Sequence, residues 1–169
     1  AKDKDRVRMY SLNPSNGKIK QLQAKEDVIS DYSIANQAFE MVYFGLSASN
    51  SQRLYTYNLK NDASSCLIDL SKEILRDVTL GEVQDWNFVS AQGDTIYGRF
   101  YLPPHFDATK KYPMIVYYYG GTTPTTRGIS NPYCAQLFAS RDYVVYVIQP
   151  SGTIGFGQEF SARHVNAWG

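Results

Sequence analysis

The chain has 169 residues, a net charge of +1 and 43% apolar residues. This length suits one ordinary domain or two small ones, with enough apolar residues to form a core. Basic and acidic residues are interspersed and nearly balanced, so the composition gives no reason to expect nucleic acid or an anionic membrane surface as a partner. No apolar run approaches the roughly 20 residues of a membrane span. The charged start does not resemble a signal peptide, and it looks like a cut made inside a longer protein.

Residues 1 to about 80 predict short antiparallel strands joined by turns. Residues 6–12 and 18–22 flank a dense turn signal, Asn13-Pro14-Ser15-Asn16-Gly17, and so predict a hairpin. Further strands are expected over 32–35, 40–46, 52–59 and 66–70. The even spacing favours a meander such as a propeller blade, with a small sandwich or barrel as the alternative. Eighty residues hold at most two blades, so this segment is not expected to close a ring alone.

The pattern changes at about Leu80. Residues 84–90 and 95–102 predict a second hairpin. The run that follows Pro113 is apolar without alternation and ends at Gly120-Gly121, which predicts a strand buried on both faces. Because the side chains at such positions are usually internal, Tyr117 and Tyr118 are expected in the core.

The last part of the chain predicts a second parallel strand. Residues 133–141 read as a helix, with Asn131 as its N-cap and Pro132 at its first position. Residues 143–148 form another apolar strand, followed by a glycine-rich loop and a helix over 158–167. Strand, helix and strand in this order indicate a parallel unit with a right-handed crossover.

Both halves look like pieces of larger folds, because two parallel strands and a hairpin leave open sheet edges. The predicted fold class is therefore a β meander, as in terminal β-propeller strands, followed by the N-terminal part of an α/β-hydrolase domain. The predicted boundaries are 1–80 and 81–169. Open edges also predict association of this chain into a homo-oligomer or by strand exchange.

Tyr119, Gly120 and Gly121 are the candidate site residues. In open α/β sheets ligands bind just outside the carboxyl ends of the strands, and glycines let the backbone turn and approach a ligand. The residues alone leave open the alternative that Tyr119 only caps the strand and packs its ring.

No metal or cofactor site is predicted. Cys66 and Cys134 form no motif and are expected to be small buried side chains, and His105 and His164 are isolated. The glycines of Gly152-x-x-Gly155-x-Gly157 are spaced in the reverse of a dinucleotide-binding loop, so a strand-to-helix connection is the preferred interpretation.

Several segments together carry a family resemblance. The order is a strand meander, a hairpin that ends Leu102-Pro103-Pro104-His105-Phe106-Asp107, then Lys110-Lys111-Tyr112-Pro113 and a strand that ends Tyr119-Gly120-Gly121. The later segments 152–160 and 166–169 continue the pattern. This arrangement resembles the prolyl oligopeptidase family, especially its dipeptidyl peptidase IV branch, most strongly over residues 84–169.

The resemblance implies a propeller packed on an α/β-hydrolase domain that cuts short peptides with a Ser-Asp-His triad. A G-x-S-x-G nucleophile elbow is absent from the sequence, since residues 45–49 and 128–132 both lack the final glycine. The nucleophile, acid and base are therefore expected beyond Gly169, and this chain alone is predicted to be inactive. The resemblance assigns Tyr119 the role of an oxyanion-hole donor through its hydroxyl group, with Gly120 and Gly121 in the oxyanion loop.

Two positions depart from the family pattern, Thr122 where proline is frequent and Ser151 where arginine is usual. Two other functions stay open: a non-catalytic interaction module that has lost the triad, or an esterase on the same scaffold. By resemblance the parent protein takes short peptides as substrates and needs no cofactor. The resemblance favours a periplasmic or secreted location, with a cytoplasmic one as the alternative.

Overall fold

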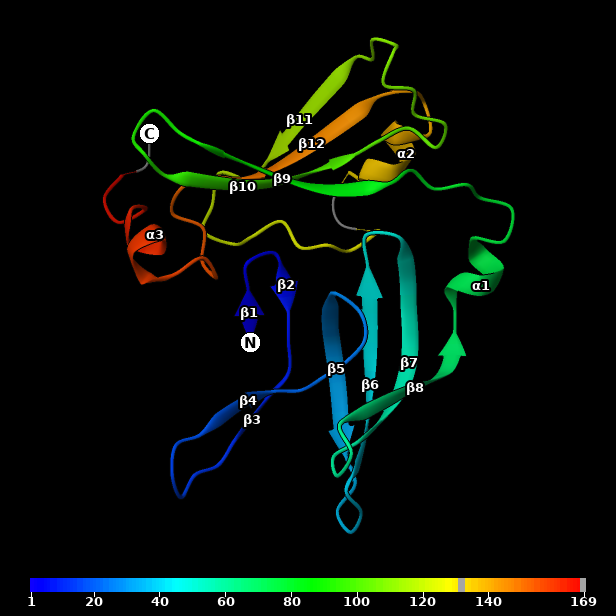
Figure 1. Ribbon diagram of the computed structural model, residues 1–169, viewed down its shortest axis with the longest axis vertical. Coiled ribbons are helices and arrows are strands. Elements are labelled where there is room, and N and C mark those ends of the chain that lie inside the picture. The colour runs from blue at the N-terminus through cyan, green and yellow to red at the C-terminus, as the bar shows by residue number, and fades with distance from the viewer. Residues whose placement is uncertain (131–132, 168–169) are drawn as a thin grey trace.

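The computed structural model describes residues 1–130 and 133–167 and consists mostly of strands, arranged in two main sheets that lie one above the other (Figure 1). The N-terminal sheet has six strands in the order β1-β2-β5-β6-β7-β8. Its strands are β1 (Lys2–Asp3), β2 (Arg6–Val7), β5 (Val28–Ile34), β6 (Glu40–Ser47), β7 (Asn50–Asn58) and β8 (Ala63–Asp69). A separate two-stranded hairpin consists of β3 (Tyr10–Leu12) and β4 (Ile19–Gln21).

The C-terminal sheet has four strands in the order β11-β12-β10-β9. A short helix, α1 (Ser71–Ile74), precedes it and was not predicted. The remaining elements are β9 (Val83–Val89), β10 (Thr95–Tyr101), β11 (Met114–Tyr118), α2 (Ala135–Ala139), β12 (Val144–Gln149) and α3 (Gln158–Ala162). The strands of this sheet run across the direction of the long strands β5, β6 and β7 (Figure 1).

The predicted meander is confirmed from β5 to β8, where each strand pairs antiparallel with the next. The predicted strand over residues 6–12 is divided between two sheets. Arg6 and Val7 pair with β1, and Val7 also pairs in parallel with Val28, whereas residues 10–12 pair with β4. The alternating pattern predicts extended backbone correctly, but it carries no information on which partner each half of the strand selects.

Buried tyrosines organise the core of the N-terminal sheet. Tyr43 and Tyr55 stack with ring centroids 5.1 Å apart. Their hydroxyl groups hold the segment that leads into β5: the Tyr43 hydroxyl accepts the Lys25 N–H at 2.8 Å, and the Tyr55 hydroxyl donates to the Glu26 Oε1 at 2.5 Å. Burial, followed by the interaction with Glu26, raises the pKa of Tyr55. The rings thus supply apolar packing while each polar end finds the partner that burial requires.

The parallel pairing of β11 with β12 across α2 is confirmed, and β12 also pairs antiparallel with β10. The prediction that the strand before Gly120 is buried on both faces is wrong. This strand, β11, lies at the edge of the sheet, and Met114, Val116 and Tyr118 are 57%, 48% and 63% exposed. Tyr118 is therefore not a core residue, whereas Tyr117 packs against the core. The run is apolar on both faces, but only one face meets a covering layer within this part of the chain.

Three smaller predictions also differ from the structure. α2 begins at Ala135 rather than at residue 133, and the expected cap residues Asn131 and Pro132 lie outside the described residues. α3 ends at Ala162 rather than at residue 167. Cys66 is exposed rather than buried, because it lies on β8 at the open edge of its sheet.

The turn between β6 and β7 links the two sheets. Ala48, in this turn, is buried in the core of the C-terminal sheet beside Ala139 of α2. The buried side chain of Gln136 donates to the Ala48 carbonyl at 3.4 Å and exchanges two hydrogen bonds with the backbone of Gly81. The predicted boundary near residue 80 is consequently a packed region, in which the N-terminal half supplies part of the C-terminal core.

We expect this chain by itself to associate in solution, because β11 and β8 are edge strands that carry exposed apolar side chains, among them Val116 and Leu67. Light scattering over a concentration series should show an increasing mass. Val116→Lys, which places a charge on the β11 edge, should lower the mass at equal concentration. A constant monomer mass at high concentration would contradict the expectation.

Candidate functional site

Tyr119 is the first residue after β11, at the carboxyl end of a parallel strand. Its side chain is 52% exposed. Within residues 1–130 and 133–167, its hydroxyl group makes no hydrogen bond. A phenol hydroxyl is both a donor and an acceptor, so Tyr119 presents an unused donor at the edge of the sheet where ligands bind in folds of this type.

Gly121 leaves the space that the ring of Tyr119 occupies. A β-carbon built on Gly121 would lie 2.5 Å from the Tyr119 Cε1 and 3.1 Å from its hydroxyl oxygen, so any larger residue would displace the ring. At Gly120, by contrast, a β-carbon would meet no atom within 4 Å. Neither glycine has a positive φ, so the backbone conformation at these two positions does not itself require glycine. The structural reason for glycine at position 121 is its close contact with the Tyr119 ring.

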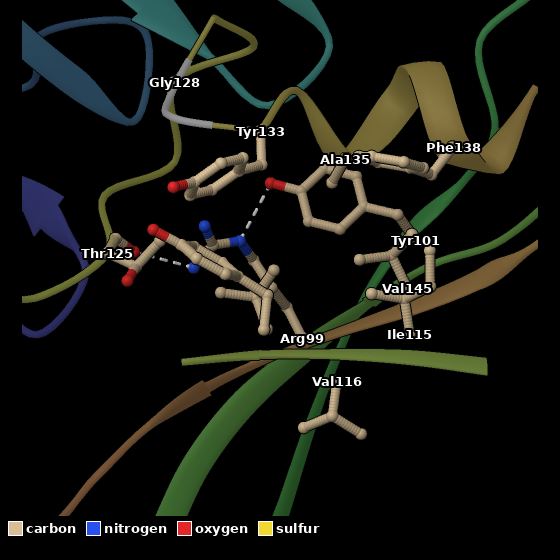
Figure 2. Close-up of a pocket in the computed structure, with 12 residues that line it drawn as sticks. Arg99, Tyr101, Ile115, Val116, Thr125, Gly128, Tyr133, Ala135, Phe138 and Val145 are labelled. Atoms are coloured by element: carbon tan, nitrogen blue, oxygen red, sulfur yellow. Dashed lines mark hydrogen bonds between the residues drawn. The ribbon is translucent and has the colours of Figure 1, made fainter. Parts of the chain in front are cut away.

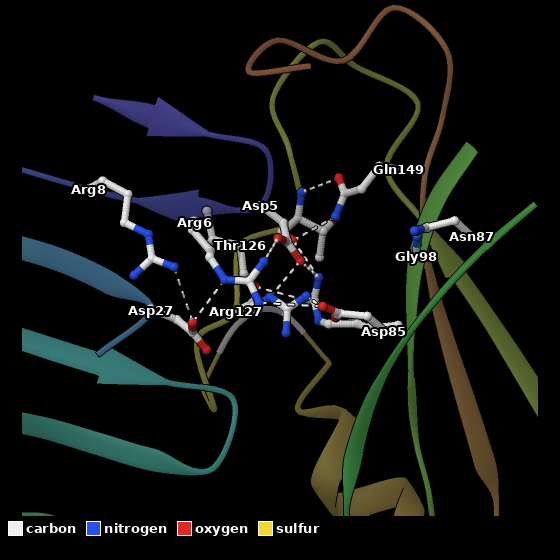
Figure 3. Close-up of polar contacts among 12 residues, drawn as sticks. Asp5, Arg6, Arg8, Asp27, Asp85, Asn87, Gly98, Thr126, Arg127 and Gln149 are labelled. Atoms are coloured by element: carbon white, nitrogen blue, oxygen red, sulfur yellow. Dashed lines mark hydrogen bonds and ion pairs between the residues drawn. The ribbon is translucent and has the colours of Figure 1, made fainter. Parts of the chain in front are cut away.

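The loop that follows β11, residues 119–127, contains the residues predicted to form an oxyanion hole and is called the oxyanion loop after that prediction. Its far end is anchored by two buried side chains, Arg99 (Figure 2) and Gln149 (Figure 3). The amide of Gln149, at the end of β12, accepts the Thr125 N–H at 3.0 Å and donates to the Thr125 carbonyl at 2.8 Å. Arg99 of β10 donates to the carbonyls of Thr125 and Thr126 at 3.0 and 2.9 Å. The loop therefore has one end in the sheet and the other clamped to two strands of the same sheet.

The predicted glycine-rich loop supports the middle of the oxyanion loop. Ile154 donates its N–H to the Thr122 carbonyl at 2.8 Å, and the Gly155 carbonyl accepts the Lys4 N–H at 2.9 Å. Gly155 has a φ of +95°, a conformation that residues with a side chain rarely adopt. Ser151, which stands where the resemblance expects arginine, is exposed at the start of this loop.

A cavity of about 290 Å³ lies beneath the oxyanion loop, between the sheet and α2 (Figure 2). Its walls are largely apolar, and Arg99, Thr125, Tyr133 and Phe138 are among the residues that line it. Arg99 donates to the Tyr101 hydroxyl, to Asp5 and to two backbone carbonyls, so its guanidinium is fully engaged in internal contacts. The cavity is thus suited to apolar side chains rather than to an anionic ligand.

A network of charged groups surrounds the anchored end of the loop (Figure 3). The Asp5 Oδ2 lies 2.8 Å from the Arg99 Nη1 and 2.9 Å from the Arg127 Nε. The second contact is an ion pair without a directed hydrogen bond, since the Arg127 Nε has no hydrogen-bond partner. Arg127 also pairs with Asp85 of β9, and Arg6 lies 2.9 Å from Asp27.

Two members of this network, Arg127 and Asp85, have pKa values shifted toward their charged forms. Burial by itself would lower the pKa of Arg127, but the Asp5 and Asp85 carboxylates outweigh it and the pKa is raised. Burial by itself would raise the pKa of Asp85, but the hydrogen bond and the charge of Arg127 outweigh it and the pKa is lowered. Both groups are therefore held charged in the folded chain.

Sequence reasoning identified Tyr119 and its glycines but missed Asp5, Arg99 and Gln149. Asp5 and Arg99 are 94 positions apart, and no spacing rule connects them. One signal was present: Arg99 is a charged residue inside a predicted strand, between Gly98 and Phe100. A charge within an otherwise apolar strand is rarely buried unless it is paired.

Other kinds of site find no support in the described part of the chain. Among residues 1–130 and 133–167, no group of three His, Cys, Asp or Glu side chains is arranged to hold a metal ion. In the same residues, no helix has both the length and the apolarity needed to cross a membrane.

Comparison with known proteins was made by sequence and by fold. No family model matches the sequence. The dipeptidyl-peptidase 5 of Porphyromonas gingivalis is 28% identical over 156 residues, which cover 92% of this chain and 22% of the relative. A probable dipeptidyl-peptidase 5 of Aspergillus terreus is 38% identical over 86 residues, 50% of this chain and 11% of the relative. The chain thus spans about a fifth or less of the length of these relatives.

Solved structures of peptidases share the fold. The acylaminoacyl peptidase of Pyrococcus horikoshii superposes with a TM-score of 0.77 at 20% identity, covering 95% of this chain and 24% of that one. A putative dipeptidyl aminopeptidase IV of Bacteroides ovatus superposes with a TM-score of 0.68 at 21% identity, covering 94% of this chain and 23% of that one. These comparisons confirm the predicted resemblance: over nearly its whole length, this chain is related to peptidases of the prolyl oligopeptidase family.

Proposed function

We propose that this chain is a segment of a serine peptidase that hydrolyses peptide bonds of short peptides, of the dipeptidyl-peptidase or oligopeptidase type. Residues 1–80 form the last strands of a β-propeller, and residues 81–169 form the first part of an α/β-hydrolase domain. The serine nucleophile, its histidine base and the aspartate lie in the longer parent protein, outside this chain. The chain contributes Tyr119 as an oxyanion-hole donor and is inactive alone.

The observation that carries the proposal is the unused hydroxyl of Tyr119 at the carboxyl end of β11. When a serine attacks a peptide carbonyl, negative charge develops on the carbonyl oxygen, and the phenol O–H donates a hydrogen bond to it. The second donor in this fold is a backbone N–H next to the nucleophile. Gly121 leaves room for the ring in this position, and the loop is anchored at Thr125, which together favour a donor that is positioned before the substrate arrives.

The substrate class is supported by the names of the relatives, two of which are dipeptidyl-peptidases. The parent protein should therefore release dipeptides from the N-terminus of short peptides. Matched chromogenic substrates with a free and an acetylated N-terminus, together with an ester analogue, distinguish the possibilities. Cleavage of the free dipeptidyl substrate supports the proposal, cleavage of the ester alone indicates an esterase, and no cleavage of any substrate indicates a non-catalytic protein.

Tyr119→Phe in the parent protein removes the hydroxyl and keeps the ring. Loss of one oxyanion-hole donor typically reduces kcat by about 100-fold to 1000-fold, and we expect a reduction of that order with KM nearly unchanged. Steady-state kinetics measure both constants. Tyr118→Phe, on the exposed face of the preceding strand, is the matched control and should leave kcat unchanged. An unaltered kcat in Tyr119→Phe would remove the assigned role.

Gly121→Ala tests whether the ring must lie against the glycine. The added methyl group would meet the Tyr119 ring at 2.5 Å, so we expect the ring to move and kcat to decrease. Gly120→Ala is the control, because its methyl group enters open space and should change kcat less than about twofold. Equal effects of the two substitutions would show that the contact with the ring has no catalytic importance.

A further inference from the structure

We propose that Asp5 is a positioning residue of the oxyanion loop: through Arg99 and Arg127 it holds the far end of that loop and so fixes Tyr119. The inference rests on the proposed function, since it concerns the same donor. It assigns a part in catalysis to a residue in the N-terminal sheet, on the turn between β1 and β2.

Asp5 is a buried carboxylate shared by two buried cations. It is 6% exposed, and the side chains of Arg99 and Arg127 are 1% and 8% exposed. Asp5 also accepts the Arg127 N–H through its own backbone carbonyl at 3.2 Å. Without this carboxylate, two guanidinium groups would share a buried volume without their common counter-charge, which is a costly arrangement.

Arg99 transmits the position of Asp5 to the loop. The Arg99 Nη1 donates both to Asp5 and to the Thr125 carbonyl, and its Nη2 donates to the Thr126 carbonyl. The planar guanidinium thus joins the carboxylate on one sheet to two consecutive backbone groups of the loop. Loss of Asp5 frees Arg99 to turn and releases these carbonyls.

A second connection runs from the same turn to the middle of the loop. Lys4, next to Asp5, donates its N–H to the Gly155 carbonyl, and Ile154 donates its N–H to the Thr122 carbonyl. Thr122 is only three residues from Tyr119. The β1–β2 turn therefore contacts the oxyanion loop directly at Arg127 (Figure 3). It contacts the loop indirectly at Thr125 and Thr126 through Arg99, and at Thr122 through the glycine-rich loop.

Within residues 1–130 and 133–167, the contacts of Asp5 do not include Tyr119. Asp5 therefore acts on the reaction only by fixing the loop. A donor displaced by a fraction of an ångström loses much of its effect in the transition state while substrate affinity changes little. The signature of the proposed role is a lower kcat at a nearly constant KM, and this loss must depend on the Tyr119 hydroxyl.

The test is a double-mutant cycle in the parent protein with Asp5→Asn, which keeps the shape of the side chain, and Tyr119→Phe. We expect Asp5→Asn to lower kcat about tenfold and to change KM less than about twofold. In the Tyr119→Phe background the same substitution should change kcat less than about twofold, because no donor remains to be misplaced. Asp62→Asn, which removes a carboxylate paired with Lys20 on an exposed hairpin, is the matched control and should leave kcat unchanged.

Two results would overturn the inference while the proposed function stands: an unaltered kcat in Asp5→Asn, or an equal loss in both backgrounds, which indicates general damage. Wild-type protein without peptidase activity would overturn the proposed function itself. If Asp5→Asn does not fold, Arg99→Lys takes its place in the cycle, because lysine keeps the charge but lacks the fork that contacts Thr125 and Thr126. The same dependence on Tyr119 is expected, and its absence would contradict the inference.

Discussion

The contact on which the arrangement of the two sheets most depends is the Asp5 carboxylate between Arg99 and Arg127. A buried ion pair gains little net stability over apolar packing, but removal of one partner typically costs about 3–5 kcal/mol. The contact of Asp5 with the two arginines therefore contributes to a specific arrangement of the sheets more than to the free energy of unfolding. The placement of the β1–β2 turn provides Arg99 with a carboxylate and gives Arg127 a second one beside Asp85, and Arg99 in turn contacts the carbonyls of Thr125 and Thr126 in the oxyanion loop.

Apolar packing supplies the stability that this ionic contact does not. Ala48 reaches from the N-terminal sheet into the core around Tyr101, Val145 and Val147, and Gln136 closes the region with hydrogen bonds to both halves. Apolar contact resists separation of the sheets without selecting their orientation, whereas the charges and the Gln136 amide are directional. Apolar packing thus keeps the two sheets together, and the directional polar contacts set their orientation.

The fold was predictable where local pattern decides it. Alternation and turn residues located β6 to β10 and only the C-terminal end of β5, and the apolar runs located β11 and β12 with their parallel pairing. What failed depends on contacts distant in sequence: the exposure of Tyr118 follows from the position of β11 at an edge, and the division of residues 6–12 follows from a choice of partner. At the candidate site, Tyr119 was predicted from its place after a strand, whereas Asp5 could not be predicted because only the fold brings it to Arg99.

The insertion of Ala48 and Asp5 into the C-terminal half has a consequence for the order of folding. The strands β5 to β8 pair with their neighbours in the sequence, so their loops are short and close quickly. The bonds from Asp5 to Arg99 and from Ala48 to Gln136 close loops of 94 and 88 residues. The N-terminal sheet is synthesised first. Its β1–β2 turn and its β6–β7 turn stay uncovered until β10 and α2 have been synthesised. The contacts that anchor the loop carrying Tyr119 can therefore form only when residues of both halves are present.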